Sequence, residues 1–184
     1  MTKVAVLVGS LRRASWSRKL AQAMIDLAPD LDCAIVEIGA LPIYNQDFDD
    51  DGSPPPAYTE FRTAMAGYDA VLFVTPEYNR SVPGVLKNAL DVGSRPYGKS
   101  VWSGKPAAVI SNSPGAIGGA MANHHLRQSL VFLDMPTLQQ PEAYIGNVAK
   151  LFADDGSIVP ASRGFLAKIM AAFTIWIERT APHG

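Results

Sequence analysis

The chain has 184 residues, a formal net charge of −1, 48% hydrophobic residues and 18% charged residues. This length suits one domain that buries about 70% of its unfolded surface, and the balanced composition excludes an intrinsically disordered chain. The basic residues are scattered, which argues against a nucleic-acid interface. We therefore expect a single domain over residues 1–184 with no nucleic-acid partner.

The sequence also argues against secretion and membrane insertion. The apolar run Val4–Val8 is too short for a signal peptide, and no stretch approaches the length of a membrane span. The single cysteine, Cys33, cannot form an internal disulfide, and we expect it to be buried in a strand and inert. These features predict a soluble cytoplasmic protein without a membrane partner.

Apolar runs with strand character alternate with helical patterns along the chain. The predicted strands are Val4–Val8, Cys33–Ile38, Ala70–Val74, Ala107–Ser111 and a short one near Thr137–Gln139. The predicted helices are Ser15–Leu27, Tyr58–Ala66, Gly84–Val92, Gly118–Leu133 and Ser162–Arg179. This alternation predicts an α/β fold with a doubly wound, five-stranded parallel sheet. On the pattern alone, the flavodoxin-like strand order 2-1-3-4-5 and the Rossmann order both stay open.

The loop that follows the first strand, Gly9–Arg18, opens onto a helix and is rich in anion-binding groups. Serine hydroxyls, arginines and the free backbone N–H groups of a helix N-terminus suit a phosphate dianion. The alternative is a surface turn in which Ser15 or Ser17 caps the helix. The loop lacks the Gly-Lys-Ser/Thr of a P-loop and the three glycines of a dinucleotide fingerprint.

The third strand runs into the stretch Thr75–Asp91. Pro76 stops the strand, and Ser81 and Pro83 start the next helix. The loop between them is polar and contains an aromatic residue. Ligands bind at the carboxyl ends of strands in open α/β sheets, so this loop is a candidate binding site.

A long, proline-rich connection spans residues 40–57. Its acidic part, Asp47–Gly52, fits the first half of an EF-hand loop, but Tyr58 stands where a bidentate glutamate is needed. We therefore expect a solvated acidic loop and no metal site. A loop this long is often a lid or a contact surface, and Leu41–Asn45 is apolar enough to cover a planar ligand or a partner subunit.

The fourth strand runs into Asn112–Gly119, whose glycines permit positive φ and close approach of the backbone to a flat ring. A tight strand-to-helix turn is the alternative. In a 2-1-3-4-5 sheet, the loops after the first, third and fourth strands converge on one edge.

The remaining candidates for catalysis are few. Of the adjacent His124 and His125, we expect one to be exposed and the other to lie at a packing or subunit contact, and neither has metal-ligand spacing. The sequence shows no Ser-His-Asp arrangement and no His/Cys cluster. For an enzyme, this assigns the difficult chemistry to a cofactor.

Three motifs resemble one known family. Pro-Glu-Tyr-Asn at 76–79, followed by Val-Pro-Gly-x-Leu-Lys-Asn-Ala-Leu-Asp at 82–91, resembles the signature of the NADPH-dependent FMN reductase family, the flavodoxin-like quinone, chromate and azo-dye reductases. Gly-Ser-Leu-Arg-x-x-Ser at 9–15 resembles the FMN-phosphate loop of this family, and Ser-x-Gly-x-x-Gly-Gly at 113–119 resembles its third flavin loop.

The resemblance implies the 2-1-3-4-5 sheet and FMN as the cofactor. It implies that FMN is bound by three sets of residues, one from each motif: Ser10, Arg12, Ser15, Trp16 and Ser17; Pro76, Glu77, Tyr78 and Asn79; and Ser113, Gly115 and Gly118. The flavin N5 would carry the chemistry, and no side chain would be needed as a proton donor.

The resemblance also implies a reaction. NADPH or NADH would reduce the flavin in a ping-pong cycle, and a small-molecule acceptor such as a quinone, chromate, an azo compound or free flavin would then take the electrons. Substrate contacts would come from Tyr78, Asn79 and Arg80, with Arg80 a candidate for the 2′-phosphate of NADPH. A homo-oligomer, either dimer or tetramer, is expected. The alternative is a flavodoxin-like electron carrier without substrate turnover, but such carriers tend to be acidic and this chain is nearly neutral.

Overall fold

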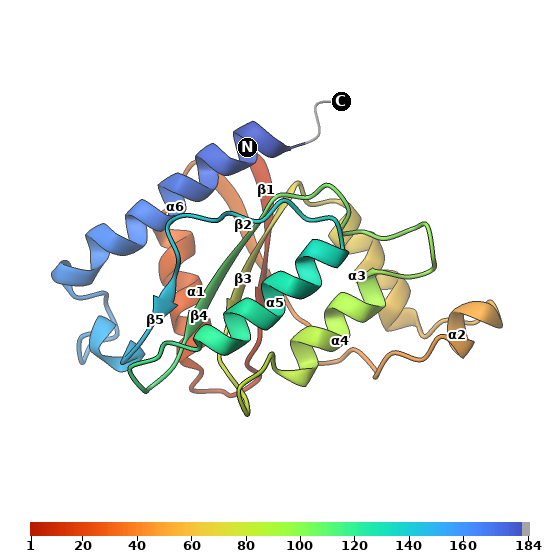
Figure 1. Ribbon diagram of the computed structural model, residues 1–184, viewed down its shortest axis with the longest axis horizontal. Helices are drawn as coiled ribbons and strands as arrows, with labels where there is room; N and C mark the ends of the chain where they lie inside the picture. The colour runs from red at the N-terminus through yellow and green to blue at the C-terminus, as the bar shows by residue number, and fades with distance from the viewer. Residues whose placement is uncertain (182–184) are drawn as a thin grey trace.

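Five parallel strands form one sheet in the order β2-β1-β3-β4-β5 in a computed structural model that describes residues 1–181 (Figure 1). The strands are β1 (Thr2–Val8), β2 (Leu31–Val36), β3 (Ala70–Thr75), β4 (Ala107–Asn112) and β5 (Tyr144–Ile145). This order confirms the flavodoxin-like prediction and rules out the Rossmann order. β1 pairs with β2 on one side and with β3 on the other, so the strand order changes direction at β1.

The central strands are apolar because both faces of the sheet are covered. Every residue of β3 and of β4 is buried, as expected for strands of a parallel sheet packed on two sides by helices. Their continuous apolar runs explain why the sequence predicted them well. The edge strand β2 is only partly buried and ends at Val36, two residues before the predicted end.

The predicted position of the fifth strand is wrong. Thr137 makes only an isolated bridge to Ala107, and the paired strand lies further along the chain, where Tyr144 and Ile145 pair with Ser111 and Asn112. A strand of two residues carries too little pattern to be found by periodicity.

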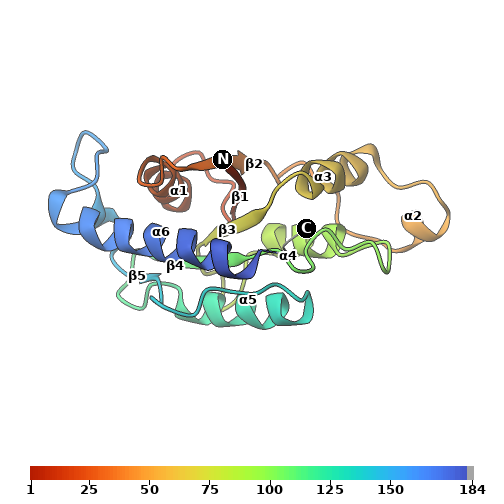
Figure 2. The same ribbon diagram turned by 90° about the horizontal axis from the view of Figure 1, so that it is seen from above.

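Helices cover both faces of the sheet. They are α1 (Trp16–Asp26), α2 (Asp47–Asp50), α3 (Pro56–Ala66), α4 (Gly84–Gly93), α5 (Ala120–Phe132), the 3₁₀ helix η1 (Val148–Leu151) and α6 (Pro160–Thr180). One apolar cluster joins the sheet to α1 and α6, and a second joins its other face to α3, α4 and α5. Figure 2 shows these two layers on opposite sides of the strands. Residues 1–181 contain no helix that combines the length and hydropathy needed to cross a membrane.

The long helix α6 packs through one stripe of its surface. Ile169, Phe173 and Ile177 are buried as predicted, whereas Phe165 is 46% exposed and Leu166 takes its place in the core. The short helix α2 was not predicted. It lies in the connection 40–57, which projects beside α3 and α4 (Figure 1).

Candidate functional site

Three loops lie side by side along the edge of the sheet formed by the carboxyl ends of the strands, at the bottom of Figure 1. They connect β1 to α1 (residues 9–15), β3 to α4 (residues 76–83) and β4 to α5 (residues 113–119). The strand order brings them together, because β1, β3 and β4 are neighbours in the sheet. The sequence segments singled out as candidate sites therefore form one continuous surface.

Buried hydrogen bonds join the bases of these loops. The Asn112 side chain, only 2% exposed, donates to Ser17 Oγ (3.0 Å) and to the Thr75 carbonyl (3.2 Å). One amide thus connects β4 with both α1 and β3. The Ser17 hydroxyl, predicted to bind the cofactor, is buried and already engaged with Asn112.

The first loop leaves β1 and passes very close to the end of β3. The backbone N–H of Gly9 donates to the Val74 carbonyl (2.9 Å), and a Cβ at Gly9 would lie 2.8 Å from Thr75 Oγ1. Only glycine fits this approach. Ser15 then caps α1 by accepting a hydrogen bond from the Arg18 N–H (3.1 Å).

The side chains of the first loop divide between packing and solvent. Trp16 stacks on Phe152 with 5.7 Å between ring centroids, so its ring packs against the segment that follows η1. Ser10 is buried, whereas Arg12 and Arg13 are exposed and have no hydrogen-bonded side-chain partner within residues 1–181. Together with the N-terminal backbone of α1, the Arg12 guanidinium group forms a surface suited to an anion.

The second loop contains a tight hairpin turn. Tyr78 and Ser81 exchange two backbone hydrogen bonds (3.1 and 3.0 Å), and Asn79 and Arg80 between them have φ values of 50° and 65°. Positive φ at both central residues is the geometry of a type I′ turn, which usually contains glycine. At Arg80, this backbone conformation costs about 1 kcal/mol or more. Strain of this kind tends to occur at functional sites.

The hairpin is attached to α5 by side chains. The Glu77 carboxylate accepts a hydrogen bond from the Ala122 backbone N–H (3.1 Å), and Ser81 Oγ lies 3.0 Å from His125 Nδ1. Glu77 also pairs with Arg80 at 3.6 Å, and its side chain is only 12% exposed. The Glu77 carboxylate therefore holds α5, whereas Tyr78, which is 44% exposed, faces solvent.

The third loop is shaped by Ser113 and by glycines. Ser113 Oγ donates to the Gly115 carbonyl (2.9 Å) and accepts from the Gly118 N–H (3.1 Å). Gly118 has φ +68°, and a Cβ there would lie 2.5 Å from the Tyr144 carbonyl carbon. The loop is thus pressed against β5, whereas a Cβ on Gly115 would meet only Ser113 Oγ, at 3.9 Å.

Both histidines of α5 are exposed, so the expectation that one of them lies at a packing contact is not met within the chain. His124 Nε2 lies 3.1 Å from the Tyr144 hydroxyl, which donates to Glu142 Oε1 at 2.9 Å. Desolvation and the nearby Glu142 carboxylate raise the pKa of Tyr144 above its ordinary value. Residues 1–181 contain no group of three or more His, Cys, Asp or Glu side chains placed to hold a metal.

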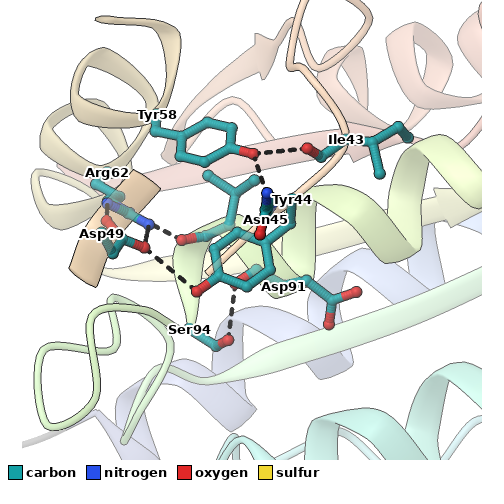
Figure 3. A network of polar contacts seen from close by, with 9 residues as sticks. Ile43, Tyr44, Asn45, Asp49, Tyr58, Arg62, Asp91 and Ser94 are labelled. Carbon is teal, nitrogen blue, oxygen red and sulfur yellow. Dashed lines mark hydrogen bonds and ion pairs between the residues drawn. The ribbon is translucent and has the colours of Figure 1, made fainter. Parts of the chain in front are cut away.

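The connection 40–57 is fixed to the helices beside it (Figure 3). Arg62 on α3 forms two hydrogen bonds with the Asp49 carboxylate (2.7 and 2.8 Å) and one with the Val92 carbonyl (2.9 Å). The Tyr58 hydroxyl donates to the Ile43 carbonyl (2.8 Å). The Asp49 side chain is 4% exposed, so the prediction of a solvated acidic loop is wrong at this residue. These contacts favour a fixed surface over a moving lid.

Asn88 holds the start of the same connection. Its buried amide accepts a hydrogen bond from the Tyr44 N–H (2.8 Å) and donates to the carbonyls of Leu41 (3.3 Å) and Pro42 (2.9 Å). The segment Leu41–Asn45, predicted to cover a ligand or a partner, is therefore positioned by a residue of the Thr75–Asp91 motif.

The sequence did not identify the buried amides Asn88, Asn112 and Asn123 as positioning residues. Asn123, fully buried on α5, donates to Ser111 Oγ (3.2 Å) and accepts from Arg127 Nε (2.8 Å). A signal was available for Asn88, which interrupts the apolar face formed by Leu86, Ala89 and Leu90.

Comparisons with known proteins agree with this arrangement. Residues 2–150 match the family described as NADPH-dependent FMN reductase. The chain is 59% identical to a quinone reductase of Pseudomonas putida over 95% of this chain and 94% of the relative. It is 48% identical to a 2-hydroxy-1,4-benzoquinone reductase of a Burkholderia species over 96% of each chain. A solved structure, the flavoenzyme NAD(P)H:(acceptor) oxidoreductase FerB of Paracoccus denitrificans, superposes with a TM-score of 0.92 at 42% identity, covering 99% of this chain and 100% of that one.

Proposed function

Because the chain belongs to the NADPH-dependent FMN reductase family and is thus an FMN-dependent NAD(P)H oxidoreductase, we propose that it reduces quinones in a ping-pong cycle. The observation that carries this proposal is the convergence of the three loops on one edge of the sheet, supported by the quinone-reductase names of its relatives. Chromate, azo compounds and free flavin are further candidate acceptors.

The first loop fits the FMN phosphate. A phosphate dianion needs several hydrogen-bond donors and positive charge. The free backbone N–H groups of the first turn of α1 supply donors, and the exposed Arg12 supplies charge. We assign the phosphate to Ser10, Arg12 and Ser15 together with the backbone of Trp16 and Ser17, because the Trp16 ring and the Ser17 hydroxyl are engaged elsewhere.

The second and third loops fit a flat ring. The open space beside Gly115 allows a planar group to approach the backbone. On the other side, the hairpin presents Tyr78 and the backbone of Pro76–Asn79. When bound, FMN accepts two electrons from NAD(P)H and passes them on to an acceptor. The residues of this chain bind and orient the reactants, and backbone N–H groups beside the ring favour negative charge there.

The way the loops are joined supports a ping-pong order. Glu77 and His125 attach the hairpin to α5, which itself begins at the third loop, so the two loops border one shared space. Two substrates that need the same space use it in turn. Tyr78, Asn79 and Arg80 at its exposed rim are the proposed substrate contacts.

We further propose that the protein is a homo-oligomer, a dimer or tetramer. Two large aromatic residues line one surface hollow between the end of α5 and the connection from α4 to β4, and both are strongly exposed: Tyr97 (92%) and Phe132 (83%). Covering such a patch with a second copy removes apolar surface from water. Light scattering coupled to size-exclusion chromatography measures the assembly directly.

The visible spectrum of the purified protein tests the function. Flavin bands that bleach under anaerobic NADPH and recover with benzoquinone are the expected result. Bands that resist NADPH would favour the electron-carrier alternative. A protein that takes up no FMN even when FMN is supplied would refute the site assignment.

A further inference from the structure

A cavity of about 330 Å³ lies beside the first loop, on the side away from the second and third loops, which we call the ring loops because they are proposed to hold the flavin ring. Its walls come from the carboxyl ends of β1 and β2, from the loop itself and from α1. The lining residues are Val8, Ser10, Leu11, Arg12, Arg13, Arg18, Ile35, Val36, Glu37 and Ile38. This volume is at the lower end of the range for small-molecule sites, and apart from Ser10 and Arg12 none of these residues has a role in the function proposed above.

The sheet places this cavity on one side of the phosphate and the ring on the other. β1 lies between β2 and β3. The cavity opens between the ends of β1 and β2, whereas the ring loops follow β3 and β4. A group in the cavity would therefore continue outward from the flavin phosphate and would not compete with the ring.

The lining combines positive charge, one carboxylate and an apolar wall. Arg12 and Arg13 are exposed and lack side-chain partners among residues 1–181. Arg18 pairs with Glu37 at 2.5 Å. The hydrogen bond from Arg18 lowers the pKa of Glu37, so the carboxylate stays ionised at neutral pH. Ile35 and Val36 add an apolar surface.

This combination matches the parts of a phosphorylated adenosine. Guanidinium groups bind phosphate through charge-assisted hydrogen bonds. In α/β nucleotide-binding proteins, an acidic residue some 20 residues beyond the phosphate loop accepts a hydrogen bond from a free ribose 2′-OH, whereas an arginine accommodates a 2′-phosphate. Glu37 directly follows β2 and lies 28 positions after Gly9, the start of the phosphate loop. The apolar wall suits a flat purine.

We propose that this cavity binds the phosphorylated adenosine half of a dinucleotide next to the flavin phosphate. This inference rests on the proposed FMN site, because Ser10 and Arg12 border both. Two sources have the required chemistry: the adenylate of FAD, which is joined to the flavin phosphate, and the adenosine phosphate of NADPH. In the first case the protein accepts FAD as well as FMN.

Two titrations test the proposal. In the first, apo-protein is titrated with FMN and with FAD, followed by flavin fluorescence. In the second, FMN-loaded protein is titrated with 2′,5′-ADP by calorimetry. The variants are Arg13→Ala and Glu37→Ala, which change the cavity outside the predicted FMN contacts. Arg163→Ala, an exposed arginine on α6 that does not line the cavity, is the matched control.

We expect Arg13→Ala to weaken binding of the adenosine ligand about tenfold, the loss of one charge-assisted hydrogen bond, with FMN affinity unchanged within twofold. Glu37→Ala should weaken FAD about tenfold but not 2′,5′-ADP, whose 2′ oxygen carries a phosphate instead of a hydrogen-bond donor. In Arg13→Ala, a loss confined to FAD identifies the adenylate of FAD, and a loss confined to 2′,5′-ADP identifies the adenosine phosphate of NADPH. FAD and 2′,5′-ADP affinities that ignore both variants, or that fall only in Arg80→Ala, overturn the proposal. Failure of FMN itself to bind would instead refute the proposed function, and the 2′,5′-ADP titration, then run on the apo-protein, would still decide the cavity.

Discussion

The Glu77 carboxylate accepts a hydrogen bond from the backbone N–H of Ala122, with 3.1 Å between Oε2 and N. Ala122 is the third residue of α5, and α5 follows Gly119, which has no side chain to cap it. Glu77 therefore supplies from another segment the acceptor that an N-cap residue normally supplies. A negative charge near the N-terminus of a helix also interacts favourably with the positive end of the helix dipole. One residue of the hairpin thus fixes both the hairpin and the helix that follows the third loop.

Replacing Glu77 tests this coupling. We expect Glu77→Ala to lower the free energy of unfolding by about 1 kcal/mol, as for loss of an N-cap, and to weaken FMN binding because the two ring loops lose their connection. Glu77→Gln keeps an acceptor oxygen and should retain most of the stability and most of the FMN affinity. Urea unfolding and FMN titration measure the two effects. Glu60→Ala, at an exposed position of α3, is the control. Equal FMN affinity in wild type and Glu77→Ala would show that the contact serves stability alone.

The sequence predicted which loops come together at the edge of the sheet, but not the contacts that support them. The buried runs of β1, β3 and β4 predicted where the strands end, and the strand order then placed the three loops together. The partner of a buried amide is not written in local pattern: Asn112 meets Ser17 from 95 positions away. The same holds for Glu77, whose carboxylate resembles any loop carboxylate until α5 is seen beside it. The two-residue strand β5 was misplaced because only its pairing with β4 identifies it.

The ion pair between Asp49 and Arg62 should stabilise the fold more than the pair between Lys87 and Asp91. The first pair is nearly buried, with side chains 4% and 12% exposed, whereas the second is 51% and 42% exposed. We expect Asp49→Asn to lower the free energy of unfolding by about 2–3 kcal/mol, because Arg62 loses its charge partner in a poorly hydrated place. Asp91→Asn, the control, should change it by about 0.3–0.5 kcal/mol. If urea unfolding showed the same loss of free energy for Asp49→Asn and Asp91→Asn, the predicted difference between the two ion pairs would be contradicted.

The effect of Asp49 should depend on pH. The hydrogen bonds from Arg62 lower the pKa of Asp49 in the folded state. A depressed carboxyl pKa contributes stability that is fully present above the unfolded pKa, about 3.9, and is lost as pH falls through the folded value. The difference between wild type and Asp49→Asn should therefore be constant from about pH 7 to 5 and shrink below about pH 4. Urea unfolding at several pH values checks this, and a difference that grows on acidification would refute it.

Cys33 on β2 should react slowly with thiol reagents. It is half-buried, and desolvation together with the nearby Asp32 raises its thiol pKa to about 11. The thiolate is the reactive form, so at pH 8 its population should be on the order of a hundredfold below that of an ordinary cysteine. We expect the rate of reaction with a disulfide reagent to rise with pH through 9 and 10 without a plateau. The urea-unfolded protein is the control and should react fast at pH 8. A plateau near pH 9 in the folded protein would show an unperturbed thiol.

Any side chain at Gly118 should destabilise the protein. Besides straining the backbone, it would clash with β5. Gly118 and Gly156 both have positive φ (+68° and +85°), but a Cβ at Gly156 would meet nothing within 4 Å, whereas at Gly118 it would lie 2.5 Å from the backbone of Tyr144. Gly156→Ala should therefore lower the free energy of unfolding only through backbone strain, by about 1–2 kcal/mol. Gly118→Ala should lose this and more, because β5 or the third loop must move.

The two variants should also differ in cofactor binding. A displaced third loop changes the surface proposed to face the flavin ring, so Gly118→Ala is expected to weaken FMN binding about tenfold or more. Gly156→Ala, in the turn before α6, should bind FMN like the wild type. Urea unfolding and FMN titration on both proteins separate strain from clash. If the two variants lose the same stability and keep the same FMN affinity, the contact between the third loop and β5 does not shape the site.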